Sequence, residues 1–285
     1  MDHRRSENKN ITGRKIMTVK NTGIIGLGAM GYQMARHMVK KGFHVAGYDV
    51  QPAAMAKAKE AGIHTVSGPA EVGAEAEVVI VMVATDDQVA DVVVNSGLLH
   101  RLVNGSVICI SSSTSPETAK ELEGICNARG LGCLDTPVVL GQPAADAGTL
   151  TVFCGGKADA FEKAKPVLSA FGKNVMHVGA SGTGQLTKTA NNMLLWACMS
   201  ANYEVLSLAK KLGADVPKLV AALQHSSGAN WSLEKWGEST GKWAEKDMDV
   251  ALELAQDAKM AVPLTALVDQ LMKGMNQQKM KALLE

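Results

Sequence analysis

Lys188 and Asn192 are the residues whose types and spacing point most directly to chemistry. They follow a turn of small residues at 182–184, within a stretch whose apolar positions keep a helical spacing from 186 to 212. Four residues apart on a helix, they share one face. A lysine ammonium can protonate a carbonyl oxygen and stabilise an alkoxide. A helical lysine with an i+4 neighbour is most often a solvated surface residue, so the pair alone leaves both interpretations open.

The elements around this pair predict two domains. Before residue 182, short β-branched runs alternate with amphipathic segments, and after it every long segment reads as helix. Strands are expected at 22–27, 43–48, 78–83, 107–110, 131–135, 150–154 and 174–178, with a loop at 136–149. The alternation predicts an α/β Rossmann-type N-terminal domain, joined by a long helix to an all-α C-terminal domain. We assign residues 1–20 to a disordered or leader segment, 21–181 to the first domain and 182–285 to a helical substrate and oligomerisation domain.

A glycine-rich turn lies between the first strand and the first helix. It comprises Gly26, Leu27, Gly28, Ala29, Met30 and Gly31. In G-x-G-x-x-G the first glycine permits a tight turn, the second lets a pyrophosphate approach the backbone, and the third lets helix and strand pack closely. This pattern in this context predicts a dinucleotide site.

Asp49 ends the second strand, 18 residues beyond Gly31. An acid at about this spacing binds the ribose hydroxyls of NAD. The Asp49 carboxylate would repel a 2′-phosphate, and the next three residues supply no cation. We therefore expect NAD rather than NADP.

Two further segments follow strands whose carboxyl ends would line the cofactor cleft. Val83 and Ala84 lie at the end of the strand at 78–83 and are expected to contact the cofactor. The hydroxyl run at 111–115 precedes Pro116. These hydroxyls could bond a nicotinamide ribose or could simply cap the following helix, and composition leaves both open.

Composition narrows the function classes. The formal net charge of +1 argues against a nucleic-acid or anionic-membrane partner, and no apolar run reaches the length of a membrane span. The five cysteines form no metal-binding or disulfide pattern, so we expect free, mostly buried thiols and no metal site. A cytoplasmic protein acting on a small molecule is the default.

With these motifs placed, the sequence resembles the β-hydroxyacid dehydrogenase family, which includes 3-hydroxyisobutyrate dehydrogenases, tartronate semialdehyde reductases and glyoxylate/succinic semialdehyde reductases. The resemblance covers the chain from about Asn21 to the C-terminal helices. It rests on the glycine fingerprint, the 148–156 stretch, the 182–192 segment and the Lys246-Asp247 pair. The family's C-terminal domain is of the 6-phosphogluconate dehydrogenase type.

The resemblance implies roles for particular residues. Lys188 would be the general acid or base for hydride transfer with NAD, and Asn192 would orient Lys188 and the substrate. Ser113 would contact the nicotinamide side of the cofactor, and Lys246 would cover the cofactor from the helical domain. The substrate would be a small 3-hydroxy acid or its semialdehyde. Family members associate through the helical half, which implies a homodimer or homotetramer.

One departure from the family bears on the substrate. The usual Ser-Gly-Gly that holds the substrate carboxylate is replaced by Val139, Leu140 and Gly141.

A second departure is the segment from Trp231 to Lys246. It is shorter than in typical members and holds three of the four tryptophans. Two interpretations stay open for these tryptophans: the wall of an apolar substrate pocket, or packing between helices or at a subunit interface. The alternatives are the same chemistry on a carbonyl compound without the usual carboxylate contact, or a non-catalytic NAD-binding scaffold or sensor.

Overall fold

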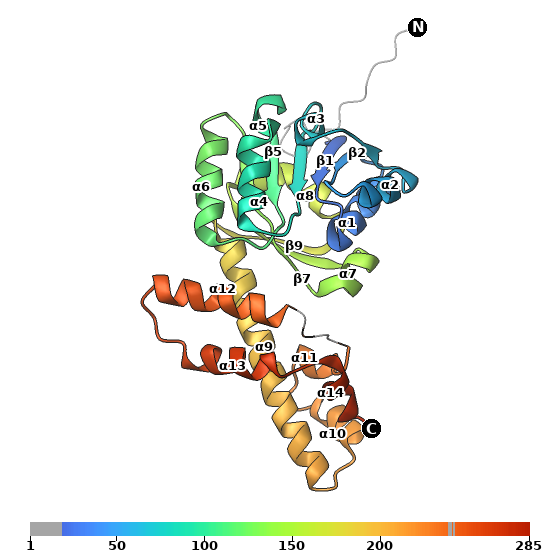
Figure 1. Cartoon of the computed structure of the whole chain (residues 1–285), viewed down its shortest axis with the longest axis vertical. Coiled ribbons are helices and arrows are strands. Elements are labelled where there is room, and N and C mark those ends of the chain that lie inside the picture. The colour runs from blue at the N-terminus through green and yellow to red at the C-terminus, as the bar shows by residue number, and fades with distance from the viewer. Residues whose placement is uncertain (1–18, 239–240, 242) are drawn as a thin grey trace, which may run out of the picture. The chain divides into compact units, whose positions relative to one another are not determined.

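The computed structural model describes residues 19–238, 241 and 243–285; most of the segment assigned to a leader lies outside these residues. The chain divides into two compact units, the first ending at Leu186 and the second covering Thr187–Glu285. The first contains a largely parallel α/β sheet and the second is helical (Figure 1). The predicted fold class, a Rossmann-like domain followed by a helical domain that starts with a long helix, is confirmed.

In the described part of the first unit, nine strands form one sheet. The strands are β1 (Asn21–Ile25), β2 (His44–Tyr48), β3 (His64–Thr65), β4 (Val78–Val81), β5 (Val107–Ile110), β6 (Gly132–Asp135), β7 (Val138–Val139), β8 (Leu150–Gly156) and β9 (Gly172–Gly179). Strands β3-β2-β1-β4-β5-β6 are parallel neighbours in that order, and β8 runs antiparallel to β6 and β7. The strand order reverses at β1 and β4, the switch point where doubly wound sheets bind ligands.

Helices cover both faces of the sheet because the central strands are apolar on both sides. In β4, Val78 and Ile80 face one core while Val79 and Val81 face the other. The helices are α1 (Ala29–Lys40), α2 (Pro52–Glu60), α3 (Pro69–Val72), α4 (Asp86–Ala90), a π-helical turn η1 (Asp91–Asn95), α5 (Leu98–Arg101), α6 (Pro116–Asn127), α7 (Gly141–Ala147) and α8 (Ala158–Leu168). Helices α1, α2 and α8 pack on the first face, and α3 to α6 on the second.

The prediction of a loop at 136–149 is wrong, because the structure forms strand β7 and helix α7 there. Strand β7 has only two residues and α7 is rich in small ones, so neither shows an apolar periodicity along the sequence. Ala144 and Ala145 are buried against the core of the first face, which stabilises a helix too short to show an amphipathic stripe.

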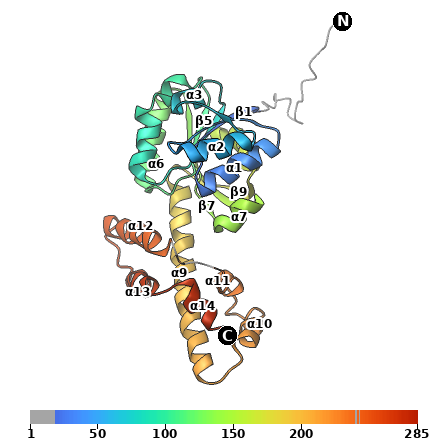
Figure 2. The same ribbon diagram turned by 45° about the vertical axis from the view of Figure 1, so that its right-hand side comes forward.

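The second unit is built along the long helix α9 (Thr183–Lys211), whose first turn belongs to the first unit. The other helices of this unit are α10 (Val216–Leu223), α11 (Trp231–Glu234), α12 (Ala244–Asp257), α13 (Pro263–Lys273) and α14 (Gln277–Ala282). They lie around α9 (Figure 2). Their shared core includes Trp196, Leu206, Met248 and Met272.

Candidate functional site

The glycine fingerprint lies at the carboxyl end of β1, where two of its glycines are required by packing. A Cβ on Gly26 would lie 2.1 Å from the Met82 carbonyl oxygen, and one on Gly31 would lie 2.0 Å from the Gly26 carbonyl oxygen. Gly28 differs, because a Cβ there would meet no described atom within 4 Å. The protein itself does not need glycine at this position, whereas a pyrophosphate approaching the backbone does. These residues therefore fit a bound dinucleotide.

Asp49 lies beside this glycine loop, as its spacing predicted. Its Oδ2 accepts the Leu27 N–H at 2.7 Å, and its Oδ1 accepts the Gln51 N–H at 2.8 Å. The carboxylate is thus held at the end of β2 by backbone donors from the loop and from the start of α2. Val50, next in the chain, is 76% exposed and carries no charge.

The ends of β4 and β5 meet at the same edge of the sheet. Val83 is half-buried, Ala84 is exposed, and the Val83 N–H donates to Ser112 Oγ at 2.8 Å. Ser115 caps α6 by accepting the backbone N–H three residues on, at 3.0 Å. Part of the hydroxyl run therefore serves the helix cap, while Ser113 is half-buried on the loop before it.

The loop that replaces the family's Ser-Gly-Gly keeps a glycine-like backbone. Leu140 has φ 83° and Gly141 has φ 69°, two successive left-handed residues at the N-cap and first position of α7. A left-handed conformation costs a non-glycine residue about 1–2 kcal/mol. Val139 is buried in β7, whereas Leu140 is 38% exposed. The loop thus has a backbone shape suited to glycine and adds an apolar side chain to it.

In the second unit, one face of α9 carries Lys188, Asn192 and Trp196, at successive i+4 spacings. Trp196 Nε1 donates to Asp247 Oδ2 at 3.0 Å, and the Asn192 side chain also bonds the Asp247 carboxylate. Lys188 interacts electrostatically with the same carboxylate. Helices α9 and α12 therefore bring the predicted lysine and asparagine together around an acid.

Burial lowers the pKa of Lys188 to about 8 because the ammonium is partly removed from water. The Asp247 carboxylate opposes this shift, and the nearby Lys246 ammonium adds to it. Burial also raises the pKa of Asp247, against the hydrogen bond from Trp196 and the attraction of both lysines. Lys246 lies near the start of α12, which agrees with the prediction that the Lys246-Asp247 pair heads a helix, and its side chain is exposed. A lysine that gains or loses its proton close to neutral pH is suited to general acid–base work.

Asp247 and Trp196 are the residues of this cluster that sequence reasoning missed as site residues. The signal for Trp196 was available, since it continues the Lys188–Asn192 spacing by one more turn. Asp247 was noted only as part of a motif, because nothing local reveals which residue of α9 a side chain on α12 will contact.

Asp135 and Gln185 were also missed, and they anchor the first turn of α9. The buried Asp135 carboxylate accepts the N–H groups of Gly182 and Gln185, each at 2.8 Å. Burial raises the pKa of Asp135, and these backbone donors oppose the shift. The Gln185 side chain donates to the Ser112 carbonyl at 2.7 Å and accepts the Thr114 N–H at 3.2 Å. The helix start is thereby bonded to the β5–α6 loop.

The tryptophans before Lys246 divide into packed and exposed residues. Trp236 lies in the helical core and donates to the Met280 carbonyl at 3.0 Å. Trp231 is 44% exposed and Trp243 is 59% exposed. Trp231 begins α11, whose N-cap residue Asn230 is hydrogen-bonded to α9. Packing between helices therefore accounts for Trp236, whereas the side chains of Trp231 and Trp243 lie at the surface.

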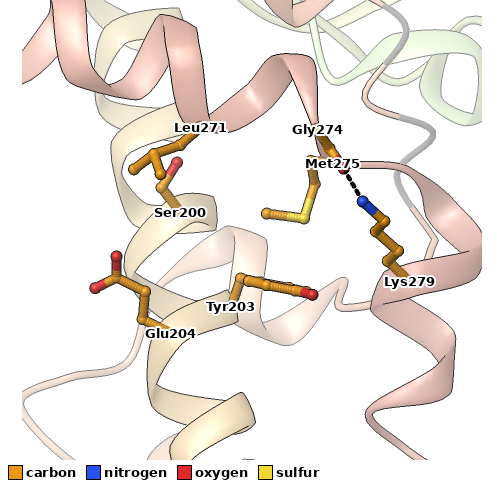
Figure 3. Close-up of a pocket in the computed structure, with 7 residues that line it drawn as sticks. All are labelled: Ser200, Tyr203, Glu204, Leu271, Gly274, Met275 and Lys279. Carbon is orange, nitrogen blue, oxygen red and sulfur yellow. Dashed lines mark hydrogen bonds between the residues drawn. The ribbon is translucent and has the colours of Figure 1, made fainter.

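A cavity of about 130 Å³ lies within the helical unit, and none of the predicted site residues lines it (Figure 3). It is lined by Ser200, Tyr203, Glu204, Leu271, Gly274, Met275 and Lys279. Across residues 19–238, 241 and 243–285, no group of three or more His, Cys, Asp or Glu side chains is placed to hold a metal ion. The same described residues form no helix with the length and apolarity that crossing a bilayer requires. All five cysteines are free thiols, and four are buried.

Two features place this chain in the class of two-domain dinucleotide-dependent dehydrogenases. They are the sheet with its glycine loop and the helical unit with its lysine cluster. Residues 21–179 match the family described as the NAD binding domain of 6-phosphogluconate dehydrogenase. Residues 182–283 match the family described as NAD-binding of NADP-dependent 3-hydroxyisobutyrate dehydrogenase. The chain belongs to the 3-hydroxyisobutyrate dehydrogenase family of β-hydroxyacid dehydrogenases, which confirms the resemblance drawn from the motifs.

Individual relatives agree with this assignment. The chain is 35% identical to 3-hydroxyisobutyrate dehydrogenase of Pseudomonas aeruginosa over 261 residues, covering 85% of this chain and 88% of that protein. It is 32% identical to NAD-dependent L-serine dehydrogenase of the same organism, covering 87% and 90%. The structure of Mycobacterium tuberculosis 3-hydroxyisobutyrate dehydrogenase with L-serine matches with a TM-score of 0.84 at 27% identity, covering 90% and 93%.

Proposed function

We propose that this protein is an NAD-dependent oxidoreductase that interconverts a small 3-hydroxy acid and its semialdehyde. The observation that carries the proposal is the cluster of Lys188, Asn192 and Asp247, in which burial brings the pKa of Lys188 to about 8. In a family of β-hydroxyacid dehydrogenases, a lysine in this state is suited to exchange the proton that accompanies hydride transfer.

The proposed mechanism assigns one task to each residue of the cluster. NADH, when bound, supplies the hydride. Lys188 gives its proton to the carbonyl oxygen during reduction, and its charge stabilises the developing alkoxide. Asn192 orients Lys188 and the substrate. Asp247 stabilises the ammonium form, and Trp196 holds Asp247 in place by its indole hydrogen bond.

For the cofactor, the carboxylate of Asp49 favours NAD over NADP. Its two oxygens are fixed by backbone N–H groups, so the negative charge stays at the end of β2. A 2′-phosphate at this position would meet that charge, with the uncharged Val50 and Gln51 following it. The exposed Lys246, by resemblance, would contact the cofactor from the helical domain.

The experiment that tests the proposal follows NADH absorbance with purified protein. NAD and NADP are compared against a panel of 3-hydroxy acids, L-serine and short semialdehydes. Turnover with NAD and a 3-hydroxy acid supports the proposal. NADH binding without turnover on any substrate would instead indicate a non-catalytic scaffold or sensor, and faster turnover with NADP would contradict the role of Asp49.

A second candidate keeps this chemistry but changes the substrate, and Leu140 favours it. The apolar side chain stands on a left-handed backbone where the family has an open glycine, and Val139 replaces the serine hydroxyl. The substrate would then be a carbonyl compound that makes no carboxylate contact at this loop. Trp231, exposed at the start of α11, is a further predicted substrate contact that would suit an apolar group.

Leu140→Gly tests this candidate. We expect the unfolding free energy to stay within about 1 kcal/mol of the wild type, because relief of left-handed strain is offset by the greater freedom of glycine in the unfolded chain. We expect kcat/KM for 3-hydroxy acids to rise by about 10-fold, the scale of one hydrogen bond to a carboxylate. Leu140→Ala shortens the side chain but keeps the strain, and so separates size from backbone conformation. If the wild-type protein already had its highest kcat/KM with ordinary 3-hydroxy acids, that result would count against this candidate.

We also propose that the chain forms a homodimer or homotetramer through its helical unit. Val205 and Leu208 share one face of α9, Leu212 follows directly after its end, and each of the three is at least half exposed. On α13, Leu264 and Leu267 are likewise exposed. Contiguous exposed apolar patches mark interaction surfaces in soluble proteins.

The oligomer prediction is checked by light scattering coupled to gel filtration. We expect a mass of two or four chains for the wild type and a smaller mass for Leu208→Glu, because a charge would be buried in the interface. Lys173→Glu, at an exposed charged position on β9 of the first unit, is the control. A monomeric wild-type protein at micromolar concentration would contradict the proposal. The predicted cytoplasmic location stays a prediction.

A further inference from the structure

Helix α7 is bonded to helix α1 at both of its ends. Near its start, Gln142 Nε2 donates to the carbonyl oxygen of Ala29 at 3.2 Å. Near its end, His37 Nε2 lies 3.1 Å from the carbonyl oxygens of both Ala145 and Asp146. Since both partners are acceptors, His37 Nε2 carries a hydrogen and donates it. Two side-chain contacts therefore hold one short helix against the helix of the glycine fingerprint.

The surrounding residues are shaped to permit these contacts. Gly148 follows α7 with φ 68°, and a Cβ there would lie 2.8 Å from the His37 ring. A side chain at 148 would thus be strained and would push the ring away. Ala145 is fully buried between the helices. Gln142 Nε2 also donates to Asp146 Oδ1 at 2.7 Å, which holds its amide over α7.

We call the contacts of His37 and Gln142 between α1 and α7 the clamp. The clamp connects two predicted binding segments. Ala29 is the fourth residue of the dinucleotide fingerprint. Helix α7 begins at Gly141, directly after the left-handed Leu140 of the candidate substrate loop. A single short helix, α7, therefore joins the helix of the fingerprint to residues 139–141.

We propose that His37 and Gln142 are positioning residues that couple dinucleotide binding at residues 26–31 to the order of the loop at 139–141. The identity of the ligand at that loop rests on the proposed function. A dinucleotide that orders the fingerprint then also orders the substrate loop, and substrate bound at the loop tightens dinucleotide binding by the same factor. Through hydrogen bonds of ordinary strength, the coupling amounts to about 3- to 10-fold in affinity.

The chain offers variants that separate the clamp from general damage. Gln142→Leu and His37→Leu each remove one of the two side-chain contacts, and the half-buried Gln142 is not part of the hydrophobic core. Arg36→Leu is the matched control. Arg36 lines the same cavity of about 390 Å³ beside the clamp as His37 does, but it donates to Gln33 on its own helix at 2.6 Å.

The first readout is amide hydrogen exchange of a peptide covering residues 139–148, measured with and without saturating NADH. We expect NADH to slow this exchange in the wild type and in Arg36→Leu, but to have little effect in either clamp variant. His37→Gln, which restores an N–H donor, should recover part of the protection. NADH that binds the wild type without slowing exchange would overturn the coupling alone. Failure of the wild type to bind NADH would overturn the proposed function as well.

The second readout is the split between KM and kcat. In the clamp variants we expect KM for the best substrate of the panel to rise about 3- to 10-fold, as expected for loss of one hydrogen bond. Saturated kcat and the Kd for NADH alone should stay close to wild type, because neither side chain lies on the Lys188 cluster. A structural defect would instead lower thermal stability and leave KM of the folded fraction unchanged, and that result would contradict the proposal.

Discussion

Lys188→Ala is expected to lower turnover by about two to four orders of magnitude, the usual scale for loss of a general acid or base. The Kd for NADH should change little, because the predicted dinucleotide contacts lie on the first unit and on Lys246. The measurement is single-turnover reduction of the best semialdehyde with saturating NADH. Added methylamine should restore part of the rate, since it supplies the alkylammonium group that the variant lacks. Wild-type turnover in Lys188→Ala would exclude this lysine as the proton donor.

The pH dependence of kcat/KM in the wild-type enzyme is a second test of Lys188 as the proton donor. Burial lowers the pKa of Lys188 to about 8. Reduction needs the ammonium, so its kcat/KM should be full at lower pH and fall as pH rises through about 8. Oxidation needs the free amine, so its kcat/KM should rise over the same range.

Asp247 influences the pH at which kcat/KM changes in both directions of the reaction. Its carboxylate favours the charged lysine, so Asp247→Asn should move the pKa seen in both profiles to lower pH. Asp249→Asn, on the exposed part of the same helix, is the control. A profile that stays in place in Asp247→Asn would show that the ionising group is not Lys188.

Gly28→Ala is expected to weaken NADH binding by roughly 10- to 100-fold while leaving the fold intact, as for the insertion of one methyl group into a close-packed contact. The reason is that no described atom of the protein lies within 4 Å of the position of the new Cβ, while the backbone φ of −65° suits alanine. Thermal unfolding without ligand should be close to wild type, and a fluorescence titration with NADH gives the Kd.

Gly31→Ala is the informative contrast to this variant. Its Cβ would lie 2.0 Å from the Gly26 carbonyl oxygen, so the helix must move away from the strand and stability should fall together with binding. If Gly28→Ala bound NADH as tightly as the wild type, the pyrophosphate would not approach the backbone at this loop, and the cofactor site would have to be placed elsewhere.

Several features of this protein follow from local sequence, because their physical causes are local. A parallel, doubly covered sheet needs apolar strands alternating with amphipathic helices, and that pattern is visible along residues 21–179. The fingerprint and Asp49 were predictable because one strand-turn-helix-strand unit contains all of them. The face shared by Lys188 and Asn192 is a consequence of helical periodicity alone.

Other features were decided only by the tertiary structure, because they depend on residues far apart in the chain. Helix α7 was hidden, since its small side chains are buried by a surface that the rest of the domain supplies. The left-handed Leu140 could not be read from a residue type that normally avoids that conformation. The acid beside Lys188 comes from α12, 59 residues later, and the loss of water around the lysine ammonium arises only when the chain packs around it. Sequence periodicity thus placed the lysine on its helix, and packing determined its charge state near neutral pH.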